Sequence, residues 1–77
     1  MKPEMLVRMA NQMEDFFKSQ SHDNAVAGIE EHIRKYWDPR MRKAMAEHLA
    51  AGTETGLKPL AREAAERACA PATGGTR

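Results

Sequence analysis

Three histidines and one cysteine are the side chains of this sequence best suited to hold a metal ion. No pair among His22, His32 and His48 has the four-residue spacing that places two ligands on one face of a helix. Cys69 is the only cysteine, which excludes an internal disulfide and a multi-cysteine metal site. We therefore expect no metal site, with His48 in or beside the core and the other two histidines in solvent.

Nucleophilic catalysis would require Cys69 or a serine beside a base and an oxyanion hole. Ser19 and Ser21 lie in a polar segment typical of helix caps, and Cys69 falls near the fraying end of the last predicted helix. The neighbouring carboxylates Glu30 and Glu31 would point about 100° apart on a helix, which does not suit joint acid–base chemistry. We expect no catalytic residue in this chain and no cofactor bound by it.

The densest functional signal is the segment RKYWDPRMRK at residues 34–43, with five basic, one acidic and two aromatic side chains. In one interpretation Tyr36 and Trp37 fill the core and the basic side chains are solvated. In a second, the segment binds nucleic acid, but the acidic pair at residues 30–31 and a net charge of +1 argue against it. Because Trp, Tyr, Arg and Met are enriched at the centres of protein interfaces, we favour a third interpretation, a protein-binding surface.

Hydrophobic periodicity predicts two helices before this segment and no strand. The first begins at Pro3, a residue favoured at the first helical position. The second is expected at about 24–37, with Ser21 or Asp23 as its N-cap and Gly28 on the side away from core packing. The apolar stripes of the two helices comprise Met5, Leu6, Met9, Met13, Phe16 and Phe17, then Val26, Ile29, Ile33, Tyr36 and Trp37.

Asp38 and Pro39 are expected to end the second helix and to cap and open a third. Gly52 is expected just after the third helix, residues 53–56 form a loop, and Pro59 opens a weaker fourth helix. The apolar stripes comprise Met41, Ala44, Met45, His48 and Leu49, then Leu57, Leu60, Ala61, Ala64 and Ala68. We predict an all-α fold, a small bundle of three to four short helices, with one domain at 1–70 and a disordered, flexible C-terminal tail at 71–77.

The apolar content of the chain is low. Its 77 residues include ten Leu, Ile, Val and Phe residues and six Met, so the core alone supplies little net stability and a partner is favoured. No stretch approaches the roughly 18 apolar residues of a membrane span. The N-terminal segment carries Glu4, Glu14 and Asp15, unlike a signal peptide, and we expect a cytoplasmic protein without membrane contact.

Several motifs resemble the delta subunit of soluble NAD-dependent formate dehydrogenases that contain molybdenum or tungsten. They read LVRMANQM, FF, AVAGI, HI, YWDPRMR and GLKPL, and they lie at residues 6–13, 16–17, 25–29, 32–33, 36–42 and 56–60. The combination of MANQM with WDPRMR in a chain of this length is fairly specific. The family commonly carries another aromatic residue in place of Tyr36, which is a mild departure.

The resemblance implies a noncatalytic accessory subunit that stabilises a cytoplasmic complex or helps it to assemble. In such complexes the large alpha subunit carries bis-molybdopterin guanine dinucleotide (bis-MGD) with molybdenum or tungsten, together with iron–sulfur clusters, and oxidises formate. The beta and gamma subunits pass electrons through FMN and further clusters to NAD.

We therefore expect this chain to dock on formate dehydrogenase subunits, with the alpha subunit favoured as the partner. Two alternatives remain, a small helical nucleic-acid-binding domain and a transient assembly chaperone for cofactor insertion. The expected partner interface comprises Met9, Asn11, Tyr36, Trp37, Pro39, Arg40, Met41 and Arg42.

Overall fold

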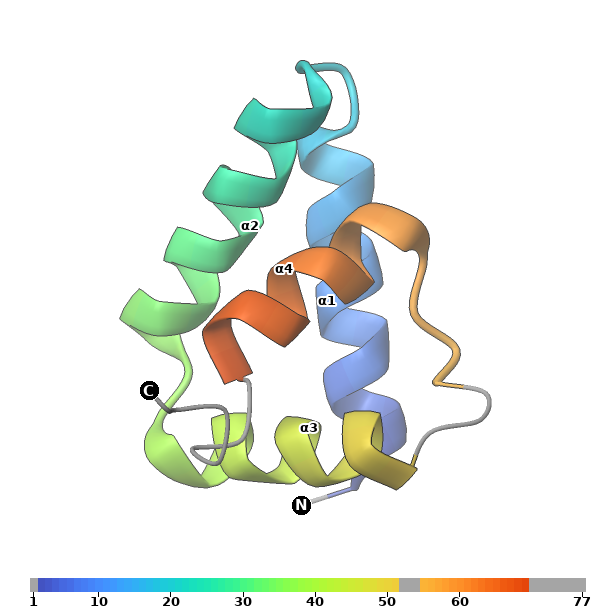
Figure 1. Cartoon of the computed structure of the whole chain (residues 1–77), viewed down its shortest axis with the longest axis vertical. Helices are drawn as coiled ribbons and strands as arrows, with labels where there is room; N and C mark the ends of the chain where they lie inside the picture. The colour runs from blue at the N-terminus through green and yellow to red at the C-terminus, as the bar shows by residue number, and fades with distance from the viewer. Residues whose placement is uncertain (1, 52–54, 70–77) are drawn as a thin grey trace.

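Four helices make up most of the protein (Figure 1). The computed structural model describes residues 2–51 and 55–69. The helices are α1 (Pro3–Phe17), α2 (His22–Tyr36), α3 (Pro39–Ala51) and α4 (Pro59–Cys69). The predicted all-α class is confirmed, and the described residues contain no strand.

Some predictions concern residues outside the described part of the chain. These are the position of Gly52, the first half of the loop at 53–56 and the tail at 71–77. The placement of the domain boundary at residue 70 also stays a prediction.

The first two helices run in opposite directions and form a V that is closed at the connection between them, residues 18–21 (Figure 1). α3 crosses the open end of the V. α4 packs between its arms and contacts α1, α2 and α3. One face of the V is therefore covered by α4.

Local sequence signals determine where the middle helices begin. Ser21 is the N-cap of α2, and its Oγ accepts a hydrogen bond from the backbone N–H of Asn24 at 3.3 Å. Asp38 Oδ1 accepts one from the backbone N–H of Met41 at 3.0 Å, and Pro39 is the first residue of α3. These predicted caps are confirmed.

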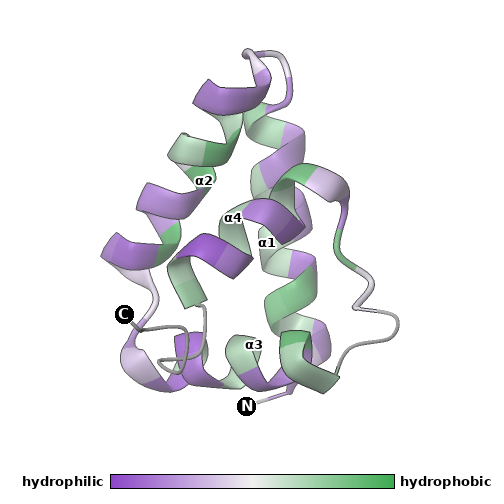
Figure 2. Ribbon diagram, viewed as in Figure 1, coloured by the Kyte–Doolittle hydropathy of each residue, from purple (hydrophilic) through white to green (hydrophobic). Residues whose placement is uncertain are grey.

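The alanine-rich α4, expected to be the weaker helix, lies at the centre of the core. Ala61, Ala64 and Ala65 are fully buried, and the helix end at Cys69 is buried too. Small side chains let helices approach closely, so the larger side chains of α1, α2 and α3 pack against this face. Figure 2 shows α2 with its hydrophilic residues turned outward, away from α4. The core comprises Leu6, Ala10, Val26, Ile29, Ile33, Trp37, Met45, Ala61, Ala64, Ala65 and Cys69.

Three side chains that were expected in apolar stripes lie on the surface. Met5 is 60% exposed, Phe16 78% and Tyr36 67%. The chain leaves the helical conformation at Trp37, which has φ −87° and ψ 132°. This change of direction places Trp37 in the core, 3% exposed, while Tyr36 remains on the outer side of α2.

Gly28 takes part in packing, contrary to the sequence-based expectation. A Cβ atom at this position would lie 2.7 Å from Cε1 of Phe17, closer than real Cβ contacts. The absence of a side chain therefore lets the Phe17 ring lie against α2 near the closed end of the V. Phe16 and Phe17 meet edge to face, with ring centroids 5.2 Å apart.

Polar side chains of α1 hold the start of α4. Asn11 Nδ2 donates a hydrogen bond to the carbonyl oxygen of Gly56 at 3.0 Å, and Asn11 Oδ1 accepts one from the backbone N–H of Lys58 at 2.9 Å. Glu14 Oε1 accepts one from the backbone N–H of Ala61 at 2.9 Å. A carboxylate is favoured there because the first N–H groups of a helix lack partners within the helix.

Asp15 completes this arrangement, which we call the α1–α4 clamp (Asn11, Glu14 and Asp15). Its Oδ1 lies 2.8 Å from Lys58 Nζ. The hydrogen bond from Lys58 lowers the pKa of the Asp15 carboxyl and raises the pKa of the Lys58 amine. Gly56, between the clamp and α4, has φ +78°, a conformation that favours glycine.

Candidate partner-binding surface

The eight residues predicted at a partner interface lie in different environments. They comprise the exposed Tyr36, Pro39 and Arg40, the half-buried Met9, Asn11, Met41 and Arg42, and the buried Trp37. The turn between α2 and α3 brings together the six residues at 36–42, whereas Asn11 belongs to the α1–α4 clamp and is engaged with residues 56–58. Their contact with a partner stays a prediction.

Trp37 combines deep burial with an unsatisfied donor. Its indole Nε1 is buried and makes no hydrogen bond to any residue in the described part of the chain. A buried tryptophan N–H normally finds an acceptor, because leaving a polar group unpaired away from water costs about 1–3 kcal/mol. The free chain therefore carries an unfavourable feature at the open end of the V.

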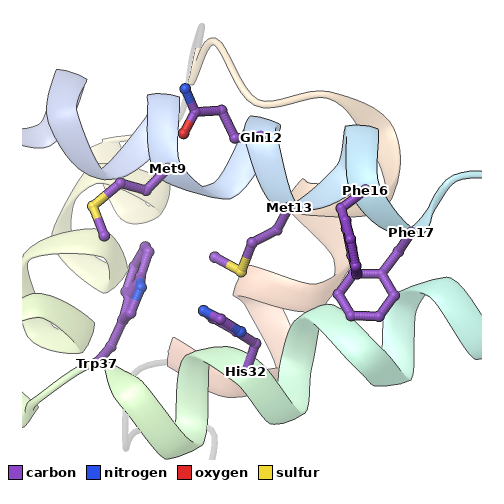
Figure 3. Close-up of a pocket in the computed structure, with 7 residues that line it drawn as sticks. All are labelled: Met9, Gln12, Met13, Phe16, Phe17, His32 and Trp37. Carbon is purple, nitrogen blue, oxygen red and sulfur yellow. The ribbon is translucent and has the colours of Figure 1, made fainter.

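A hollow of about 420 Å³ lies between α1 and α2, next to this indole (Figure 3). Met9 and Met13 on α1 point toward Trp37 and His32 across it, and α4 lies behind. We call it the α1–α2 hollow. Its lining residues are Met9, Gln12, Met13, Phe16, Phe17, His32 and Trp37.

Sequence reasoning identified only two of these lining residues, Met9 and Trp37, as interface residues. It placed Met13, Phe16 and Phe17 in the apolar stripe of the first helix and left Gln12 and His32 without a role. One signal could have indicated the exposed ring. Adjacent residues on a helix point about 100° apart, so Phe16 and Phe17 cannot both face the same narrow core.

Two further hollows lie on the surface. One, of about 240 Å³, shares Phe17 and His32 with the α1–α2 hollow and continues along α2 to Tyr36. The ring of Tyr36 lies 4.7 Å from that of His32, centroid to centroid. The other hollow, of about 500 Å³, is lined by Met5 and Arg40 among others and lies where α1 meets α3. Charged residues, among them Lys35 and Arg40, line these two hollows beside the exposed apolar side chains.

The basic side chains of segment 34–43 are divided among different environments. Arg34 lies 2.8 Å from a carboxylate oxygen of Glu30 and donates a hydrogen bond to the carbonyl oxygen of Arg67 at 3.1 Å. Arg42 Nε is buried and makes no hydrogen bond to any residue at 2–51 or 55–69. Lys35, Arg40 and Lys43 are exposed. Because Arg34 is engaged within the chain, the structure adds no support to the nucleic-acid alternative.

The single thiol is placed where it is unreactive. Cys69 is buried at the end of α4. Burial raises the pKa of the Cys69 thiol to about 11, although the nearby positive charges of Arg42 and Arg34 oppose the shift. At neutral pH the thiolate, which is the nucleophile and metal ligand, is therefore scarce.

The histidines are separated in space. His48 is half-buried, as expected, and its Nε2 lies 2.8 Å from the carbonyl oxygen of Thr55. His22 Nε2 lies 2.8 Å from Glu63 Oε1, so this exposed ring joins the starts of α2 and α4. Within the described ranges, no three His, Cys, Asp or Glu side chains are grouped so that they could hold a metal ion.

None of the four helices, over the described residues, has the length and apolar character that crossing a membrane requires. No curated protein and no solved structure gives a significant match to the chain. The model of one family, described as the NADH-dependent formate dehydrogenase delta subunit FdsD, matches residues 5–65. This match extends from the start of α1 into α4 and includes the whole α1–α2 hollow. The chain therefore belongs to the delta subunit family of NADH-dependent formate dehydrogenases.

Proposed function

We propose that this chain is a noncatalytic accessory subunit that docks on a cytoplasmic NAD-dependent formate dehydrogenase complex and stabilises it or helps it to assemble. The observation that carries the proposal is the exposed apolar surface at the α1–α2 hollow and at the neighbouring hollow along α2. Phe16 borders the first and is 78% exposed, and Tyr36 borders the second and is 67% exposed, in a chain of this family. Contiguous exposed apolar surface on a small protein is typical of an interaction site.

The large alpha subunit is the partner we favour, and the redox groups belong to the partner subunits. Those groups are bis-MGD with molybdenum or tungsten and the iron–sulfur clusters, together with FMN and the NAD site. The chemistry of this chain supports that division, since its single thiol is buried and has a raised pKa.

Co-purification tests the docking. A tagged copy of the chain is expressed with the other subunits of its complex, and the bound subunits are quantified. Tyr36→Ala and Arg40→Ala remove exposed side chains and should weaken co-purification without loss of helix content. Arg62→Ala is the matched control, because this exposed side chain lies on α4 and its ion pair with Glu66 contributes little. Full activity and stability of a purified complex without this chain would contradict the proposal.

Stoichiometry separates a permanent subunit from a transient assembly chaperone. A subunit is present in the mature, cofactor-loaded complex at a constant ratio to the alpha subunit. A chaperone is enriched on the cofactor-free alpha subunit and absent from the mature complex. Native mass spectrometry of both forms measures this ratio directly, and we expect the constant one.

A further inference from the structure

We propose that the α1–α2 hollow receives a short apolar segment of a partner subunit, which inserts one large aliphatic or aromatic side chain beside Met13 and Phe16 and brings a carbonyl oxygen to Trp37 Nε1. This inference rests on the proposed function and specifies where and how the partner binds. Three features of the hollow support it, namely its lining, its rim and the unpaired indole.

The lining suits an apolar side chain. The hollow is bordered by the thioethers of Met9 and Met13 and by aromatic rings, and no Lys, Arg, Asp or Glu is among its described lining residues. An anionic nucleotide or pterin would find no Lys or Arg among these described residues. Methionine side chains adapt to irregular partners, and a volume of about 420 Å³ lies within the range of about 300–1,000 Å³ found for ligand pockets.

The rim provides an anchor that the chain itself does not use. Phe16 is 78% exposed although it borders the hollow, whereas its neighbour Phe17 is packed against Gly28. Covering the Phe16 ring with a partner removes a large apolar surface from water. Buried aromatic side chains of this kind dominate the energy of many interfaces.

The indole defines the polar part of the partner. Trp37 Nε1 is a donor only, is buried, and makes no hydrogen bond to the residues that the structure describes. In Figure 3 the indole stands between Met9 and His32 at one end of the hollow. Because the nitrogen is buried in the free chain, the proposal requires the flexible Met9 or Met13 side chain to shift and open a path to it. An oxygen acceptor that enters there satisfies the donor, so binding removes an unfavourable feature of the free chain.

The segment at 70–77 is a poor occupant, because it reads APATGGTR and offers no large apolar side chain. A second copy of the chain is the competing occupant. Because the family name describes one subunit of a larger enzyme, we assign the hollow to another subunit of that complex.

Affinity measurements with the complete chain and a complex prepared without it test the proposal. Phe16→Ser changes an exposed ring and should lower affinity about thirtyfold, the effect of losing an interface anchor. Trp37→Phe retains an aromatic core residue but deletes the N–H group, and should lower affinity about fivefold, the effect of one hydrogen bond. Circular dichroism melting identifies any variant that is impaired in folding.

Arg62→Ala is the matched control, because this exposed side chain lies on α4 and borders none of the three hollows. Its affinity should be unchanged, and a loss equal to that of Phe16→Ser would overturn the assignment to the α1–α2 hollow. A photo-crosslinking residue in place of the exposed Gln12 identifies the occupant independently of folding. An adduct with a partner subunit supports the proposal, and an adduct with a second copy of this chain overturns it.

The same measurements distinguish the two levels of inference. If the wild-type chain fails to bind the complex at all, the proposed function is wrong. If it binds and Phe16→Ser and Trp37→Phe bind equally well, the docking function stands and only the role of this hollow is wrong.

Discussion

The two sides of α1 differ in how fully the rest of the chain buries them and pairs their polar groups. Toward α4, Leu6 and Ala10 are fully buried, and Asn11 and Glu14 make hydrogen bonds to the chain that leads into α4. Toward α2, Met9 and Met13 border the α1–α2 hollow and Phe16 is exposed. The same helix therefore has one side satisfied within the chain and another that remains available to a partner.

This difference explains how a chain with few large apolar residues still forms a core. α4 brings alanines into the V, and the α1–α4 clamp fixes its start with directional polar contacts. The remaining apolar surface of α1 lies outside that arrangement. Stability and binding thus use different faces of one amphipathic helix, and substitutions on the two faces should have separable effects.

The largest expected effect is on the side that faces α4. Leu6→Ala removes a fully buried side chain and should lower the free energy of unfolding by about 3 kcal/mol, whereas Met5→Ala at the adjacent exposed position should change it by less than about 0.5 kcal/mol. Urea unfolding measures both. Should Leu6→Ala fail to fold, Leu6→Met offers a milder change below about 1.5 kcal/mol. Equal losses at positions 5 and 6 would contradict the division of α1 into two sides.

The reactivity of the Cys69 thiol, at the end of α4, measures how tightly the core is closed. Because the pKa of Cys69 is raised to about 11 from an ordinary value of 9.0, the folded chain should hold about a hundredfold less thiolate at pH 8 than an unfolded one. Alkylation with iodoacetamide should be slower by at least that factor, and should recover in urea. Rapid labelling of the folded chain would show that the end of α4 opens readily.

A substitution of a polar side chain can weaken the α1–α4 clamp without creating a cavity in the core. Glu14→Ala leaves the backbone N–H of Ala61 without its acceptor and should lower the free energy of unfolding by about 1 kcal/mol, as the loss of a helix cap does. Glu47→Ala on the exposed side of α3 is the control and should be nearly neutral. A neutral result for Glu14→Ala would show that this hydrogen bond adds nothing to the stability that the clamp provides.

The smallest effect concerns the ion pair of the clamp. The pKa of Asp15 is lowered in the folded chain, so its contribution to stability is present above its ordinary pKa of 3.8 and is lost as pH falls through the lowered value. The pKa of Lys58 is raised, so its contribution is present below 10.5 and is lost as pH rises through the raised value. NMR titration of Asp15 should give a higher pKa in Lys58→Met and no change in Lys43→Met. An unchanged value in Lys58→Met would exclude the ion pair in solution.

The helices and their starts were predictable because their signals are local. Proline at position 3, 39 or 59, the Ser21 cap and the Asp38 cap act within one helical turn. The family was also predictable, because the motifs around Trp37 and Asn11 are contiguous in the chain. These features do not depend on which helices meet.

The candidate site was only partly predictable, because periodicity shows which side chains are apolar and not which ones a neighbour covers. Phe16, Tyr36 and Met5 belong to apolar stripes that are wider than the surface offered by the other helices. Gly28 was expected on the side of the second helix that makes no packing contacts, because nothing in the nearby sequence indicates that Phe17 packs there.

The sequence by itself determined the amphipathic helices, the caps at Ser21 and Asp38 and the aromatic turn at Trp37, since each depends on residues near one another in the chain. Only the tertiary structure decided that the alanine-rich α4 occupies one face of the V and that the hollow remains on the other. The physical reason is that burial depends on the packing of distant segments, and the two faces of the V differ once a third helix covers one of them.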